Sequence, residues 1–105
     1  MIKVNCKDNK IVISGHANFA DYGKDIVCAS VSSIVTTSIN AIYLFDSEAI
    51  TYHDDSGVIT IELLSNEQSI SKLILNMFNM LKDLERQYPK NIKVEMRDNL
   101  WNLNF

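Results

Sequence analysis

Apolar and polar residues alternate in three short stretches of this chain, a pattern typical of half-buried strands. The first stretch carries its apolar side chains at Ile2, Val4 and Cys6, and the others lie at 58–63 and 92–96. Two further strands are expected at 11–13 and 50–53. The turn residues at 8–9 and 54–57 predict that these strands pair as hairpins, 2–6 with 11–13 and 50–53 with 58–63.

Two longer segments carry apolar residues at helical spacing. In the first, Asp25 is the expected N-cap of a helix that contains the charge-free stretch 26–45. At the start of the second segment, Ser65-x-x-Gln68 resembles a capping box. The helix is expected to run to about Tyr88, because Pro89 stops it. The predicted buried stripes are Val27, Val31, Ile34, Val35, Ile39 and Ile42 in the first helix and Ile70, Leu73, Ile74, Met77, Leu81 and Leu84 in the second.

The predicted order of elements is ββαββαβ, which indicates an α+β fold with a mixed sheet of about five strands and two long helices. Because three strands alternate cleanly, one sheet face is expected to be wet or only partly covered. This favours a two-layer arrangement, and the alternative places one helix on each face. We expect one domain over residues 1–97, followed by a C-terminal tail at 98–105.

The composition is that of a soluble globular protein, with 47% hydrophobic residues over 105 positions. A net charge of −3 gives no basic footprint for direct nucleic-acid binding. Because charged residues occur early in the chain, we expect no cleaved secretory signal, and we expect reduced thiols in the cytoplasm for Cys6 and Cys28. The segment 26–45 is long enough to span a bilayer, but its many hydroxyl side chains favour a helix buried in a domain or at a subunit contact.

His16 follows the end of a predicted strand, and Cys28 begins a predicted helix. The N–H groups and the dipole at a helix N-terminus favour a thiolate, and an imidazole can pair with it and pass its proton to a leaving amine. The pair therefore predicts the nucleophile and base of a small cysteine hydrolase. The alternative is structural, because a cysteine on an apolar helix is usually a small hydrophobic residue.

Other residues of this segment have predicted supporting roles. N–H groups around Cys28, unused in the first helical turn, are expected to stabilise an oxyanion. Asp25 either caps the helix, which we favour, or orients His16, and Ser32 either lines the pocket or bonds back to the helix. Gly15 and Gly23 bound a loop that they allow to move. No metal or cofactor is predicted, since phosphate-loop and zinc spacings are missing from the sequence.

The residues Gly15-His16-Ala17 and Tyr22-Gly23-x-Asp25-Ile26-Val27-Cys28-Ala29-x-x-Ser32 stand at fixed offsets in the chain. They resemble the signature of the bacterial ribosomal-processing cysteine protease family, Prp. The resemblance extends over the whole chain through its length, the order of elements and the Asp-Asp-x-Gly turn at 54–57. A motif of this length, with several residue types at fixed offsets, seldom matches by chance.

The resemblance implies a cysteine endopeptidase that removes the N-terminal extension of protein twenty-seven of the large ribosomal subunit. Cleavage follows a Phe-Phe pair in a segment similar to Asn-Leu-Gln-Phe-Phe. The family's nucleophile and general base match Cys28 and His16, and two further signature residues match Asp25 and Ser32. A homodimer and a mobile loop hinged at Gly15 and Gly23 are also implied.

The end of the tail, Asn102-Leu103-Asn104-Phe105, resembles the family's substrate segment before the cut. It either occupies the substrate groove as a weak inhibitor or covers an apolar patch of its own domain, which we favour. Two other functions are kept as alternatives to the protease. One is a ribosome-assembly module that binds the same segment without cutting it, and the other is a thiol sensor or acyl hydrolase.

Overall fold

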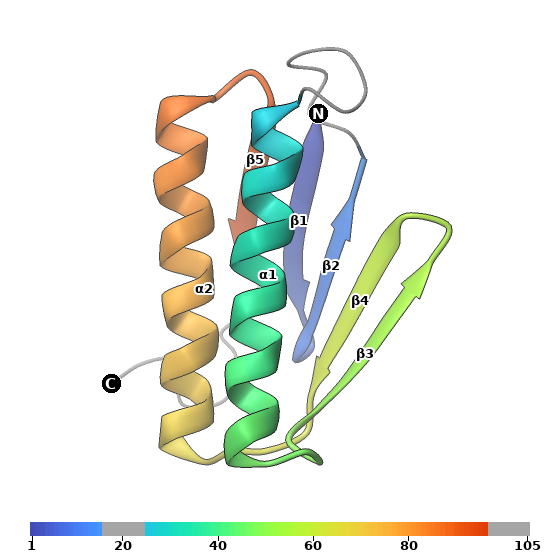
Figure 1. The fold of residues 1–105 in the computed structure, drawn as a ribbon, viewed down its shortest axis with the longest axis vertical. Helices are drawn as coiled ribbons and strands as arrows, with labels where there is room; N and C mark the ends of the chain where they lie inside the picture. Colours follow the sequence, from blue (N-terminus) through green and yellow to red (C-terminus); the bar gives the residue numbers. More distant parts are fainter. Residues whose placement is uncertain (16–24, 97–105) are drawn as a thin grey trace.

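Two long helices lie side by side on one face of a five-stranded sheet (Figure 1). The structure, a computed structural model, describes residues 1–15 and 25–96. The elements follow the predicted ββαββαβ order, so the α+β prediction is confirmed. Of the two predicted arrangements the two-layer one is correct, and the one with a helix on each face is wrong. The elements are β1 (Ile2–Lys7), β2 (Lys10–Ser14), α1 (Ile26–Phe45), β3 (Ile50–Asp55), β4 (Val58–Leu63), α2 (Gln68–Gln87) and β5 (Ile92–Met96).

The sheet has the strand order β3-β4-β2-β1-β5. β1 pairs in parallel with β5, with Val4 opposite Val94, and antiparallel with β2, with Val4 opposite Ile13. The remaining pairs are antiparallel, so the sheet is mixed as predicted. This order brings β4 beside β2, although the whole of α1 separates them in the sequence.

The core lies between the sheet and the helices, because one face of each central strand is buried and the other is wet. In β1, Ile2, Val4 and Cys6 are buried while Lys3 and Lys7 are exposed. The core side chains below 2% exposure with the largest volumes are Phe78, Ile11, Ile42, Ile61, Leu63, Ile70, Ile74, Met77, Leu81, Ile92, Val4 and Val27. Burial of apolar area on this scale is the main term that stabilises a domain of this size.

Both hairpins turn through two residues with positive φ. These are Asp8 and Asn9 in the first hairpin, and Ser56 and Gly57 in the second. Two successive positive φ angles are typical of a type I′ turn, whose twist matches that of the flanking strands. The second turn is therefore shorter than predicted, and β3 continues through Asp55 instead of ending at His53.

The capping box predicted at Ser65 and Gln68 is wrong. α2 begins at Gln68 with Glu67 as its N-cap, and the Glu67 side chain makes no capping hydrogen bond. The Ser65 hydroxyl instead accepts a hydrogen bond from the N–H of Glu67, at 3.1 Å. A serine that bonds to the backbone two residues ahead forms a local turn, which competes with helical capping.

The apolar helix α1 is long and hydrophobic enough to cross a membrane by length and composition alone. In the structure its predicted stripe packs in the core, except that Ile34 is only half-buried. Ser38 is also buried, and its hydroxyl donates to the carbonyl of Ile34 at 2.7 Å. That bond satisfies a polar group that would otherwise be costly to bury.

The parallel edge strand β5 is held to α2 by a side-chain contact. The N–H of Val94 donates to Oε2 of Glu85 at 2.9 Å. An edge strand presents backbone groups that can pair with another chain, and covering them with a side chain limits such pairing. Glu85 thus protects part of this edge while fixing the end of α2 to the sheet.

Candidate active site

Cys28 lies in the first turn of α1, where Asp25 caps the helix. Oδ1 of Asp25 accepts hydrogen bonds from the N–H of Val27 at 2.9 Å and of Cys28 at 3.0 Å. The carbonyl of Asp25 also accepts from the N–H of Ala29 at 3.2 Å, which closes the first helical turn. The predicted N-cap is confirmed. Of the N–H groups around Cys28 that were predicted to be unused in this turn, those of Val27 and Cys28 donate to the capping carboxylate.

A pocket of about 170 Å³ opens beside Cys28. Cys28 itself is half-buried, so its sulfur lies between the core and the surface. The walls come from the start of β1, the end of β2, the first two turns of α1 and the β3–β4 turn, and consist of Ile2, Ile13, Ser14, Gly15, Cys28, Val31, Ser32, Gly57 and Ile59. Four of these residues have branched aliphatic side chains, so the pocket suits an apolar group next to the cysteine.

Gly15 closes one side of this pocket in a conformation that favours glycine. Its φ is +88°, in the left-handed region, and a Cβ atom added there would overlap the carbonyl oxygen of Met1. A larger residue would therefore move the backbone at the end of β2. Gly15 directly precedes His16 in the sequence.

The structure brings three of the predicted site residues to one pocket: Cys28, Ser32 and Gly15. Asp25 lies one turn before Cys28, as the helix cap. His16 and Gly23 are outside the described residues, as is the tail at 98–105. Ser32 is exposed and lines the pocket, in agreement with the first of its two predicted roles.

Sequence analysis missed Gly57 and Ile59, which line the pocket from the β3–β4 hairpin. They reach it because β4 pairs with β2, with Ile59 opposite Ile13. The linear pattern identified both strands but carried no signal for that pairing. Among the described residues, no group of three or more His, Cys, Asp or Glu side chains could hold a metal ion.

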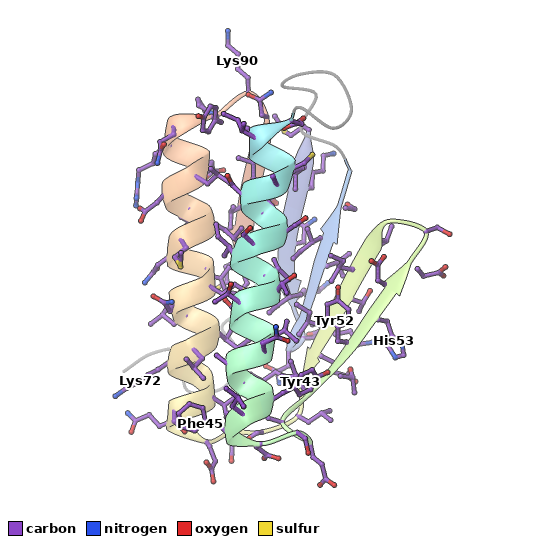
Figure 2. All side chains as sticks on the ribbon, in the orientation of Figure 1. Tyr43, Phe45, Tyr52, His53, Lys72 and Lys90 are labelled. Atoms are coloured by element: carbon purple, nitrogen blue, oxygen red, sulfur yellow. The ribbon has the colours of Figure 1, made fainter. Side chains whose placement is uncertain are left out.

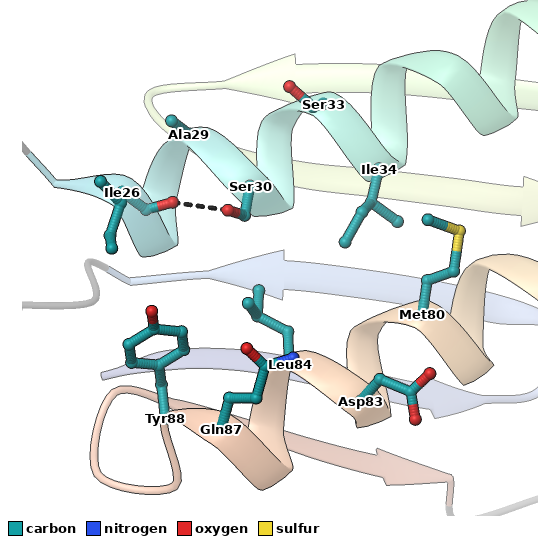
Figure 3. Close-up of a pocket in the computed structure, with 10 residues that line it drawn as sticks. All are labelled: Ile26, Ala29, Ser30, Ser33, Ile34, Met80, Asp83, Leu84, Gln87 and Tyr88. Atoms are coloured by element: carbon teal, nitrogen blue, oxygen red, sulfur yellow. Dashed lines mark hydrogen bonds between the residues drawn. The ribbon is translucent and has the colours of Figure 1, made fainter.

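A larger pocket of about 690 Å³ lies between α1 and α2 (Figure 3). Ile34 and Leu84 point into it from the two helices, and Ser30 at its edge donates to the carbonyl of Ile26 at 2.7 Å. Its lining includes neither Cys28 nor the ends of β1 and β2. Size alone therefore does not locate the chemistry, and the smaller pocket beside Cys28 is the candidate active site.

This arrangement suits nucleophilic chemistry on a bound chain. A sulfur in the first turn of a helix is close to the positive end of the helix dipole, which favours negative charge there. The adjoining apolar pocket can hold a side chain of the substrate and so position a carbonyl carbon near the sulfur. These features fit acyl transfer to Cys28.

Comparisons with known proteins show the family to which this chain belongs. The family described as cysteine protease Prp matches residues 1–93. The ribosomal processing cysteine protease Prp of Staphylococcus aureus is 34% identical over 94 residues, which cover 87% of this chain and 89% of the relative. That of Mycoplasma pneumoniae is 37% identical over 100 residues, covering 90% and 94%.

The fold comparison agrees with the sequence comparison. The crystal structure of the essential ribosomal processing protease Prp from S. aureus, in complex with a covalently linked product peptide, superposes with a TM-score of 0.82. The two chains are 27% identical, and the match covers 91% of this chain and 97% of the other. Both comparisons extend over nearly the whole chain, which is thus an enzyme of the cysteine protease Prp family.

Proposed function

We propose that this enzyme removes the N-terminal extension of protein twenty-seven of the large ribosomal subunit, cutting after a Phe-Phe pair. The proposal is supported by the relatives from S. aureus and M. pneumoniae, which are named ribosomal processing proteases. The observation that carries it is Cys28, half-buried in the first turn of α1 beside an aliphatic pocket of about 170 Å³. A benzyl side chain is an apolar group that such a pocket can receive.

In the proposed reaction, the thiolate sulfur of Cys28 attacks the carbonyl carbon of the scissile peptide bond. The C–N bond breaks, and the leaving amine takes a proton from the imidazolium of His16. A thioester then joins Cys28 to the N-terminal fragment. His16 removes a proton from water as the water oxygen attacks the thioester, and the sulfur leaves as thiolate while the fragment is released as a carboxylic acid.

The assignment of His16 is supported by chain connectivity. Consecutive α-carbons are about 3.8 Å apart, and Gly15, the residue before His16, lines the same pocket as Cys28. A base attached directly after Gly15 starts close enough to the pocket to exchange a proton with the Cys28 sulfur. The glycines at 15 and 23 are proposed to let this segment adjust around the substrate.

Asp25 is proposed to support the nucleophile by holding the first turn of α1. Because its carboxylate already accepts from the N–H of Cys28, an oxyanion at this site would compete with Asp25 for that donor. The capping bond and an oxyanion bond to the same N–H are therefore alternatives, unless the hydrogen is shared between them.

We also propose that the enzyme is a cytoplasmic homodimer that acts on a protein segment and not on nucleic acid. The net charge of −3 supports the second part, since it provides no general attraction for phosphate. Light scattering of the purified chain tests the dimer, and a monomer at micromolar concentration would contradict it.

Cleavage of a peptide containing Asn-Leu-Gln-Phe-Phe-Ala tests the proposed substrate. The native enzyme, Cys28→Ala and Cys6→Ala are incubated with the peptide, and the products are identified by mass spectrometry. We expect one cut after the second phenylalanine with the native enzyme and Cys6→Ala, and none with Cys28→Ala. Tight binding without a cut by the native enzyme would instead identify a binding module.

A further inference from the structure

Tyr52 lies on the face of β3 that is turned toward the helices. It is directly opposite Ile61 of β4, and directly opposite residues of an antiparallel pair place their side chains on the same face. Ile61 is fully buried in the core between sheet and helices. Figure 2 shows Tyr52 on the helix side of the sheet and His53, the next residue, on the other side.

Although it is on the helix side, Tyr52 is 37% exposed. β3 is an edge strand, and only its first residue, Ile50, is buried. The side chain of Tyr52 therefore offers an aromatic surface to solvent on the face where the helices cover the central strands. We call the exposed part of this face, formed by Tyr52 and Asp54, the β3 inner face.

The β3 inner face continues into the pocket beside Cys28. Asp54 is opposite Ile59, and Ile59 lines that pocket together with Gly57. Tyr52 and Ile59 are diagonal neighbours across the two strands, and such residues are about 7–8 Å apart. An extended chain advances about 3.3 Å per residue, so Tyr52 is about two substrate residues from the pocket.

A peptide bound in extended form at Cys28 also runs past the surface next to the pocket. Residues two apart in an extended chain point to the same side. A side chain seated against Ile59 therefore has a neighbour, two positions along, directed at the same surface of the enzyme. Tyr52 is the exposed aromatic residue at that spacing.

We infer that Tyr52 is a specificity-determining residue that contacts an apolar or aromatic side chain of the substrate peptide, two positions from the residue bound in the Cys28 pocket. The inference rests on the proposed peptide cleavage at Cys28. A tyrosine ring suits this role because its face packs against apolar groups while its hydroxyl stays in water. Asp54 beside it disfavours an acidic side chain at that end of the surface.

The test is a cleavage profile over a library of randomised peptides, read by mass spectrometry for the native enzyme, Tyr52→Ala, Tyr52→Phe and His53→Ala. His53 is the matched control, since it is on the same strand but on the opposite face. For Tyr52→Ala we expect the preference for apolar residues to fall by about tenfold at one position, two residues from the pocket residue. In steady-state kinetics on one peptide that the native enzyme cuts, the loss appears in KM more than in kcat, and Tyr52→Phe and His53→Ala keep the native profile.

A profile of Tyr52→Ala identical to that of the native enzyme would overturn the inference. So would an equal loss at every position, or a loss of dimer in place of a changed preference. The library contains its own substrates, so the result does not depend on the ribosomal peptide. Failure to cut that peptide contradicts the proposed substrate and leaves the role of Tyr52 to be decided by the library profile.

Discussion

The carboxylate of Asp25 accepts a hydrogen bond from the backbone N–H of Cys28, with 3.0 Å between nitrogen and oxygen. A second bond, from the N–H of Val27, reaches the same oxygen at 2.9 Å. One side chain therefore satisfies two of the unpaired donors of the helix and fixes the turn that carries the sulfur. The stability of α1 and the position of the nucleophile depend on the same residue.

The change Asp25→Ala is expected to lower the free energy of unfolding by about 1 kcal/mol, the usual effect of losing an N-cap. The value of kcat should fall by more than this loss of stability accounts for, because the first turn of α1 then shifts and moves Cys28. Asp25→Asn retains a capping oxygen and should keep most of the stability. Urea unfolding and kcat measured on both variants check this, and equal activity of Asp25→Ala and native enzyme would contradict the coupling.

Gly15 and Gly57 offer a comparison of two glycines with positive φ at the rim of the same pocket. Gly57→Ala should cost about 1 kcal/mol, since its φ is +83° but nothing lies within 4 Å of an added Cβ. Gly15→Ala should cost more, because its Cβ would overlap the backbone of Met1. Thermal unfolding of the two variants measures the difference, and an equal loss in both would show that the overlap at Gly15 is relieved without cost.

The periodicity of apolar residues was sufficient to predict the order of elements and most of the core. It missed Phe78, which is 1% exposed, because a six-residue stripe already satisfied the helical pattern of α2. It also misplaced the start of α2, since Ser65 satisfied the capping-box pattern while its hydroxyl was used in a local turn. Local patterns of this kind do not reveal which of two competing hydrogen bonds forms.

The candidate site was predictable where its residues are close in sequence or stand in the motif, as Gly15 does. Asp25, Cys28 and Ser32 are one helical turn apart, so their shared position follows from the helix alone. Ile59 enters the pocket because β4 pairs with β2, and strand order is a property of the whole sheet. The exposure of Tyr52 could not be predicted either, because it depends on how far the helices extend over the edge strand.

Substitution and alkylation are expected to have opposite effects at the two cysteines. Cys28 is half-buried at the pocket and Cys6 is fully buried in β1. Cys28→Ala should abolish cleavage and leave stability nearly unchanged, whereas Cys6→Ala should keep activity and lose about 1 kcal/mol. With iodoacetamide, the folded enzyme should be alkylated at Cys28 and protected at Cys6 until it unfolds. Peptide mapping of the alkylated protein decides between the two sites, and faster labelling of Cys6 would contradict this assignment.

Phe78 of α2 measures how much of the stability comes from packing that helix on the sheet, and Phe45 at the exposed end of α1 is the control. Phe78 is 1% exposed and Phe45 is 67% exposed, so the same substitution removes a ring from the core in one case and from the surface in the other. Phe78→Ala should lower the free energy of unfolding by about 3–5 kcal/mol, through lost burial and the cavity left behind. Phe45→Ala should change it by less than about 0.5 kcal/mol. Denaturant unfolding gives both values, and a large loss at Phe45 would mean that the end of α1 is covered in solution, as in a dimer.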